Sequence, residues 1–196
     1  MISAGATITA RTTPFAHAVA PRLLDGETAA IVLEWFEDGA PWRLKLASFY
    51  EQYECNLHEA ELPARIAFLT DPVFVTQLAQ HMLDPISNDQ LELTEVNAHK
   101  LVGGQTIKIH NDYIGGAETH RVLVQLNRGW DDANGGILML FAGPRAENVE
   151  RMVRPTHASA VSFEISPTSF HAVSTIHSGE RYTLVYSFRR FRPTAG

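Results

Sequence analysis

The segment Gly103-Gly104-Gln105-Thr106-Ile107-Lys108-Ile109-His110-Asn111-Asp112 ends in a His-x-Asp pair, where a β-prone run passes into a loop. Side chains alternate between the two faces of an extended backbone, so we expect His110 and Asp112 to point to the same side. An imidazole nitrogen and a carboxylate oxygen could then bind one metal ion. Because two ligands do not complete a metal site, a third ligand must lie elsewhere in the chain.

Short apolar runs separated by turns follow one another through the second half of the chain. Glycines mark the turns, for example Gly103-Gly104 and Gly115-Gly116. The predicted strands are 91–98, 106–110, 120–125, 136–141, 159–165, 170–175 and 182–188. Many short strands at near-regular spacing favour an all-β sandwich or a jelly roll. In a jelly roll, side chains from two facing sheets converge on one cavity.

The first half of the chain predicts two helices. Apolar residues recur at helical spacing over 24–37, where Asp25 is a candidate N-cap and Gly39 marks the end, and again over 72–83 before Pro85. The alternating run 42–46 predicts a strand, and residues 15–20 predict an edge strand. We expect residues 1–90 to support a core at 91–192, within a single domain.

The aromatic and polar segment 49–56 has two interpretations. It could be the packed side of an antiparallel strand, which we favour, or the rim of a substrate pocket. In the second case Tyr50, Gln52 and Tyr53 would offer hydrogen bonds.

Composition is that of an ordinary globular protein. The chain has 196 residues, 45% of them hydrophobic and 19% charged, with a formal net charge of −6 and a mean hydropathy of −0.09. The acidic balance disfavours a dedicated nucleic-acid partner, and the basic run at 189–192 is interpreted as a solvated chain end. Cys55 is the only cysteine, which excludes an internal disulfide and a thiolate zinc site. Without an apparent secretory signal or a long apolar run, we expect a cytoplasmic location and no membrane partner.

His171 is the candidate third ligand. It lies in a β-prone run after Pro167, and alternation places it on the same face as Val173. Two His and one carboxylate form the facial triad of non-haem Fe(II) oxygenases, which leaves positions open for a 2-oxo acid and dioxygen. Arg181 lies in a later predicted strand, where its bidentate fork could hold the distant carboxylate of such an acid. The alternative for Arg181 is a surface residue paired with an acid such as Glu180.

These residues resemble the 2-oxoglutarate and Fe(II)-dependent dioxygenases, and in particular their prolyl-4-hydroxylase-like branch. The resemblance is carried by six segments: 110–112, 121–130, 135–141, 161–163, 171–173 and 181–188. It implies a mainly β fold, a double-stranded β-helix or jelly-roll core with supporting N-terminal α-helices. It also implies that His110, Asp112 and His171 bind Fe(II), and that Arg181 binds the C5 carboxylate of 2-oxoglutarate. The segment 126–130 is predicted to be structural.

The chain departs from the family pattern at two positions that commonly contact the co-substrate. Relatives often have tyrosine at the positions of Leu101 and Gln125. Gln125 is therefore a candidate replacement contact, with Thr183 and Tyr113 as further candidates.

The resemblance implies an oxidoreductase that uses 2-oxoglutarate and O2, with ascorbate as an optional reductant, and releases succinate and CO2. Asp112 favours hydroxylation of an aliphatic carbon over halogenation, because related halogenases lack that carboxylate. The expected substrate is an amino-acid side chain, free or in a peptide or protein, with proline the first candidate by analogy.

Two alternatives stay open. One is a jelly-roll protein that binds a metal or 2-oxo acid, or senses it, without turnover. The other is a dioxygenase that dealkylates nucleic acids, although such enzymes carry a second Arg where this chain has Ser187.

Overall fold

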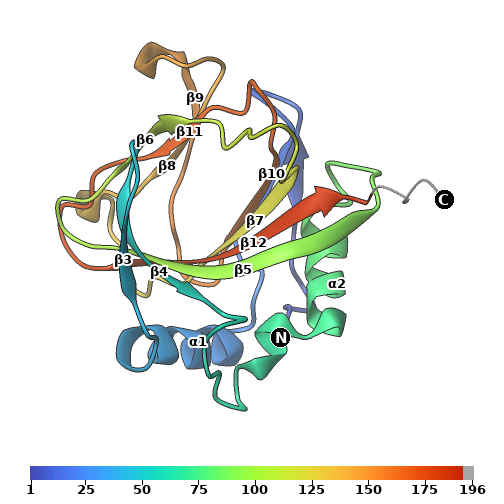
Figure 1. Ribbon diagram of the computed structural model, residues 1–196, viewed down its shortest axis with the longest axis vertical. Helices are drawn as coiled ribbons and strands as arrows, with labels where there is room; N and C mark the ends of the chain where they lie inside the picture. Colours follow the sequence, from blue (N-terminus) through green and yellow to red (C-terminus); the bar gives the residue numbers. More distant parts are fainter. Residues whose placement is uncertain (192–196) are drawn as a thin grey trace.

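The computed structural model describes residues 1–191, so Arg192 at the end of the predicted core lies outside the described residues. Figure 1 shows two facing β-sheets, with helices on the outer side of the larger one. The major sheet has eight strands in the order β1-β2-β10-β7-β12-β5-β4-β3, and the minor sheet has four in the order β6-β11-β8-β9. This arrangement confirms the predicted mainly β fold with a jelly-roll core.

The strands of the major sheet come from both halves of the chain. They are β1 (Thr9–Arg11), β2 (His17–Ala20), β3 (Arg43–Leu46), β4 (Glu51–Asn56), β5 (Leu91–Leu101), β7 (His120–Gln125), β10 (Ala160–Glu164) and β12 (Arg181–Arg190). The minor sheet consists of β6 (Ile107–His110), β8 (Leu138–Phe141), β9 (Val149–Val153) and β11 (His171–Val173). Neighbouring strands in both sheets pair antiparallel. The two longest strands, β5 and β12, are neighbours in the major sheet.

All seven strands predicted in the second half are present, with small shifts at their ends. The strand β9 was not predicted, because Val-Glu-Arg-Met-Val carries charged residues and lies at an exposed sheet edge. The N-terminal edge strand is β1, whereas β2, within the predicted segment 15–20, lies inside the sheet between β1 and β10.

Both helices begin at the residues that the sequence indicates. In α1 (Gly26–Asp38), the Asp25 side chain accepts a hydrogen bond from the Thr28 amide, and Gly39 forms the C-cap. In α2 (Pro72–Met82), Asp71 caps the N-terminus and Pro72 occupies the first turn, where its missing N–H costs nothing. Short 3-10 helices lie at Ala67–Thr70, Asp132–Asn134 and Ala146–Asn148. Among residues 1–191, no helix combines the length and apolar character needed to cross a membrane.

The alternation of side chains along β12 separates two environments. Tyr182, Leu184, Tyr186 and Phe188 belong to a buried apolar cluster that also contains residues of both helices. Arg181, Thr183, Val185 and Ser187 point the other way, into a cavity between the two sheets. The helices therefore stabilise the outer face of the major sheet and leave its inner face for polar side chains.

Candidate active site

His110 and His171 lie opposite each other on adjacent strands of the minor sheet. β6 pairs with β11 in a register that aligns these two residues, and their ring centroids are 4.2 Å apart. His171 and Val173 both line the cavity, as the alternation predicts. The pairing of β11 with β6 and β8 fixes the position of both imidazoles on a hydrogen-bonded sheet.

Asp112 joins the two histidines, but not by the predicted route. β6 ends at His110, and Asp112 adopts a left-handed backbone conformation with φ of 55° instead of continuing the strand. Its carboxylate oxygens lie 3.3 Å from Nε2 of His110 and 3.1 Å from Nε2 of His171. Asp112 therefore lies beside both histidines, as expected. The reason given from strand alternation was wrong, because a turn, and not a continued strand, brings the carboxylate to them.

The donor set fits a divalent metal ion. Nδ1 of His110 and Nδ1 of His171 each lie 2.8 Å from a backbone carbonyl, those of Lys108 and Ser169. A carbonyl only accepts hydrogen bonds, so each Nδ1 carries the proton and each neutral ring presents a lone pair at Nε2. Two lone pairs and a carboxylate, with all three ligand atoms within 4.8 Å of one another, need a shared cation between them.

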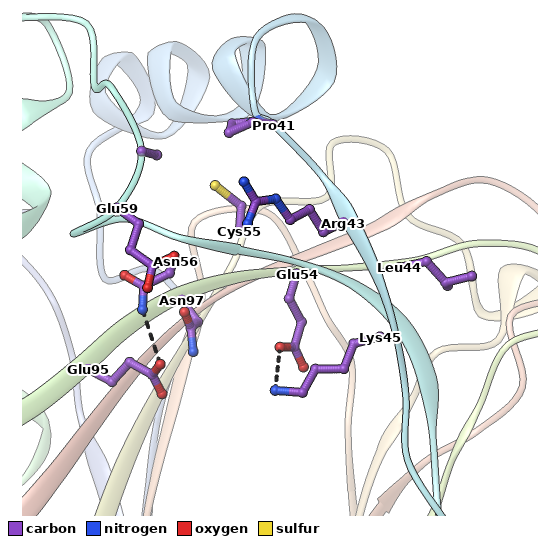
Figure 2. Close-up of a pocket in the computed structure, with 11 residues that line it drawn as sticks. Pro41, Arg43, Leu44, Lys45, Glu54, Cys55, Asn56, Glu59, Glu95 and Asn97 are labelled. Carbon is purple, nitrogen blue, oxygen red and sulfur yellow. Dashed lines mark hydrogen bonds and ion pairs between the residues drawn. The ribbon is translucent and has the colours of Figure 1, made fainter.

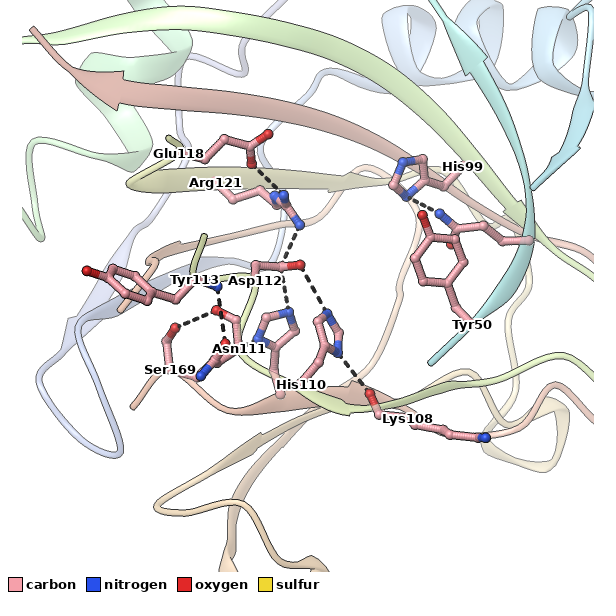
Figure 3. Close-up of polar contacts among 12 residues, drawn as sticks. Tyr50, His99, Lys108, His110, Asn111, Asp112, Tyr113, Glu118, Arg121 and Ser169 are labelled. Carbon is pink, nitrogen blue, oxygen red and sulfur yellow. Dashed lines mark hydrogen bonds and ion pairs between the residues drawn. The ribbon is translucent and has the colours of Figure 1, made fainter. Parts of the chain in front are cut away.

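Arg121 is part of the site and was not assigned a role from the sequence. Its guanidinium donates to Oδ2 of Asp112 at 2.5 Å and to Oε2 of Glu118 at 2.5 Å, as Figure 3 shows. Both Arg121 and Leu123 line the cavity from β7. The same alternation along the predicted strand 120–125 could have identified Arg121 as an inward-facing cation.

The electrostatics favour the metal-binding protonation states of Asp112 and His171. Burial alone would raise the pKa of Asp112, but the guanidinium of the neighbouring Arg121 holds that pKa well below its usual range. Burial lowers the pKa of His171, which favours its neutral form. Asp112 is thus ionised and His171 is neutral at pH 7.

Arg181 lines the same cavity from β12 of the major sheet, and the residue is only 3% exposed. Its Nη1 donates to Oγ1 of Thr183 at 2.8 Å, and that hydroxyl donates to Oε1 of Gln125 at 3.0 Å. Within residues 1–191 no acidic side chain pairs with Arg181, and its buried Nε has no hydrogen-bond partner. Burial lowers the pKa of Arg181 only to about 10, so it stays charged and can take an anionic ligand.

The other co-substrate candidates differ in position. Gln125 and Thr183 form the chain that supports Arg181, and their contact with a co-substrate stays a prediction. Tyr113 is 44% exposed and turns away from the triad in Figure 3. Leu101 faces Arg181 across the β5–β12 pair and belongs to an apolar cluster, so the polar group nearest to it on that strand face is His99.

The segment 49–56 supplies part of the cavity wall, as the pocket-rim interpretation proposed. Phe49 stacks on His110 with ring centroids 4.4 Å apart, and Tyr50 and Gln52 line the cavity of about 410 Å³. Tyr53 instead lies under the ammonium of Lys100 at 5.1 Å. Residues 51–56 also form the antiparallel strand β4, and Phe49 packs edge-on against Tyr50, so both interpretations hold in part.

Comparison with known proteins agrees with this site. Residues 95–189, which contain both histidines, Asp112 and Arg181, match the model of the 2OG-Fe(II) oxygenase superfamily. That family implies Fe(II), 2-oxoglutarate and O2 as cofactor and co-substrates.

Solved structures of prolyl hydroxylases share the fold at low sequence identity. A prolyl-4-hydroxylase from Pseudomonas putida is 18% identical, with a TM-score of 0.66 over 90% of this chain and 93% of that one. A prolyl hydroxylase from Trichoplax adhaerens, in complex with a hypoxia inducible factor peptide fragment, is 16% identical, with a TM-score of 0.72 over 89% and 83%. A viral collagen prolyl hydroxylase from Paramecium bursaria Chlorella virus-1 is 11% identical, with a TM-score of 0.66 over 89% and 96%.

Two findings agree. The family model matches residues 95–189, and the cavity offers metal ligands that suit iron and a guanidinium that suits a dicarboxylate. Over residues 95–189 this chain matches the 2OG-Fe(II) oxygenase superfamily, whose members are oxidoreductases of the dioxygenase type.

Proposed function

We propose that this protein hydroxylates an aliphatic carbon of an amino-acid side chain, in a free amino acid, a peptide or a protein. The observation that carries the proposal is a single cavity that holds both the His110–Asp112–His171 cluster and the unpaired Arg181. The triad would hold Fe(II), and Arg181 would hold the C5 carboxylate of 2-oxoglutarate. Support for a peptidyl substrate comes from the Trichoplax prolyl hydroxylase, which is seen with a peptide fragment.

The chain itself contributes binding, orientation and exclusion of water. When bound, Fe(II) supplies the oxidative chemistry that couples conversion of 2-oxoglutarate to succinate and CO2 with insertion of a hydroxyl oxygen. The backbone carbonyls of Lys108 and Ser169 orient the two imidazoles, and Arg121 orients the Asp112 carboxylate. Phe49 covers one face of His110 and limits access of water from that side.

The test is release of succinate from 2-oxoglutarate in the presence of Fe(II), ascorbate and air. We expect turnover in the unmodified protein and its loss in Asp112→Ala and Arg181→Ala, with Glu147→Gln on the exposed surface as the control. A mass increase of about 16 in an amino-acid or peptide panel would identify the hydroxylated product. Near-normal turnover in either active-site variant would contradict the assignment, and binding of 2-oxoglutarate without turnover would favour a sensor.

A further inference from the structure

The wall of the active-site cavity contains charge that the iron and 2-oxoglutarate do not use. Fe(II) and the dianionic co-substrate balance each other, as do Asp112 and Arg181. The remaining charged side chains of the cavity wall are Glu54, Glu95 and Glu118 against Lys45 and Arg121. His99 does not offset this excess, because burial lowers its pKa to about 4 and leaves it neutral at pH 7. The space left for the substrate therefore carries one excess negative charge.

The pairings within the cavity locate that charge at Glu95. Lys45 pairs with Glu54 at 3.1 Å, and Arg121 is engaged by Asp112 and Glu118. Among residues 1–191, Glu95 has no cation within ion-pair distance. Its Oε1 accepts only the amide of Asn56 at 3.2 Å, as Figure 2 shows.

Strand register fixes the direction in which Glu95 projects. Glu95 on β5 pairs with Ser187 on β12, which in turn pairs with Arg121 on β7. All three residues line the cavity, so Glu95 lies on the inner face of the major sheet, two strands from Arg121, or about 10 Å.

A second, independent acceptor lies in the same wall. The Gln52 side chain is 2% exposed and lines the cavity, and its Nε2 donates to Oε1 of Glu54 at 2.8 Å. Its buried Oε1 receives no hydrogen bond within the described chain. A buried amide oxygen without a donor is costly unless a ligand supplies one.

The active-site cavity adjoins a second cavity at this point. A neighbouring cavity of about 330 Å³ shares Lys45, Glu54, Glu95 and Asn97 with the active-site cavity. Glu95 thus stands on the common wall of the two, where a group carried by a longer substrate could reach it.

We propose that the substrate presents a cationic group, a primary ammonium or a guanidinium, to Glu95 on the wall that the active-site cavity shares with its neighbour. This inference rests on the proposed hydroxylase function and narrows its substrate class. The cation has two sources: the α-ammonium of a free amino acid, or a lysine-like or arginine-like side chain within a peptide. A neutral proline ring inside a peptide supplies neither.

Two matched pairs of probes test the proposal by isothermal titration on anaerobic protein loaded with Fe(II) and 2-oxoglutarate. L-norleucine N-methylamide against Nα-acetyl-L-norleucine N-methylamide tests the α-ammonium. Nα-acetyl-L-lysine N-methylamide against the same capped norleucine tests the side-chain cation. We expect the cationic member of at least one pair to bind about tenfold more tightly or better, because a desolvated charged hydrogen bond is worth that much.

Glu95→Gln removes the charge while keeping the shape of the side chain, and should abolish this preference. Glu147→Gln, which removes an exposed carboxylate outside both cavities, should keep it. Equal affinity within both pairs, including no binding by any probe, would overturn the inference, as would a preference that survives in Glu95→Gln. Uncoupled succinate release is measured in parallel, so a failed cation preference with normal succinate release leaves the hydroxylase proposal intact.

Discussion

Arg121 shows how one partly buried side chain can hold a metal ligand in place. Asp112 sits on left-handed backbone after the end of β6, so the strand itself does not hold its carboxylate in place. The two histidines that touch it are themselves candidate ligands. Arg121 is the remaining side-chain donor to Asp112 in the described chain, and Glu118 fixes the other end of its guanidinium. The orientation of the carboxylate therefore depends on Arg121.

Replacing Arg121 by methionine keeps most of its volume and removes both hydrogen bonds. We expect the affinity for Fe(II), measured by anaerobic titration, to fall about 10–100-fold, the usual effect of losing a partner that orients a metal ligand. Loss of the Arg121 charge also makes the Asp112 carboxylate a stronger metal ligand. We expect the loss of its orientation to lower Fe(II) affinity by more than this gain raises it, because Asp112 lies on loop backbone. Arg154→Met, which breaks an exposed pair with Asp132, is the matched control. Unchanged Fe(II) affinity in Arg121→Met would show that the strand end alone positions Asp112.

At the scale of elements, the turn before β8 supports the end of the cavity at which Arg181 lies. The indole of Trp130 donates to the carbonyl of Gly135 at 2.9 Å, which secures the Gly135-Gly136 turn. Gly136 has a φ of 67°, and a Cβ there would lie 2.8 Å from Cδ of Arg181. The backbone of this turn thus forms one side of the space that holds the Arg181 side chain.

Gly136→Ala should displace Arg181 and raise the KM for 2-oxoglutarate, while Fe(II) affinity stays unchanged. Gly129→Ala is a close control, because Gly129 also has a φ of 67° and a Cβ there would meet no atom within 4 Å. Both variants share the backbone cost of a left-handed alanine, about 1–2 kcal/mol, so the difference between them reports the crowding of the new methyl group against Arg181 and against Ile176, whose Cδ1 is also 2.8 Å away. The KM for 2-oxoglutarate is measured in both variants by varying the 2-oxoglutarate concentration. Equal KM values would mean that Arg181 adjusts freely around the new methyl group.

For the molecule as a whole, sequence periodicity predicted the helices and strands that bury one apolar face. The helices at 24–37 and 72–83 and the strand at 120–125 each bury a repeating set of apolar residues, so their patterns survive in the sequence. The iron-binding set and Arg181 were found because each lies on or beside such a strand. The positive φ of Asp112 and the pairing of Arg121 with Asp112 and Glu118 could not be predicted, because loop geometry and contacts between distant strands leave no local pattern.

Burial of histidines gives the whole fold a dependence on pH. Burial lowers the pKa of five described histidines, and that of His99 falls to about 4. The five are His17, His99, His120, His157 and His171. In the unfolded chain each takes up a proton near pH 6.5. Between pH 6.5 and 4 the unfolded state therefore binds more protons than the folded state, and stability decreases as pH falls.

We expect His99 alone to account for about 2–3 kcal/mol of lost unfolding free energy across this window, since each pKa unit corresponds to about 1.4 kcal/mol. Urea unfolding of the metal-free protein at several pH values from 7 to 4 would measure it, and His99→Gln should reduce the slope. His58, exposed on the surface, gives the control variant His58→Gln, which should keep the full slope. A slope in His99→Gln equal to that of the unmodified protein would mean that the acid sensitivity arises at the other histidines. Stability that does not change from pH 7 to pH 4 would mean that the folded chain opens enough to protonate all five.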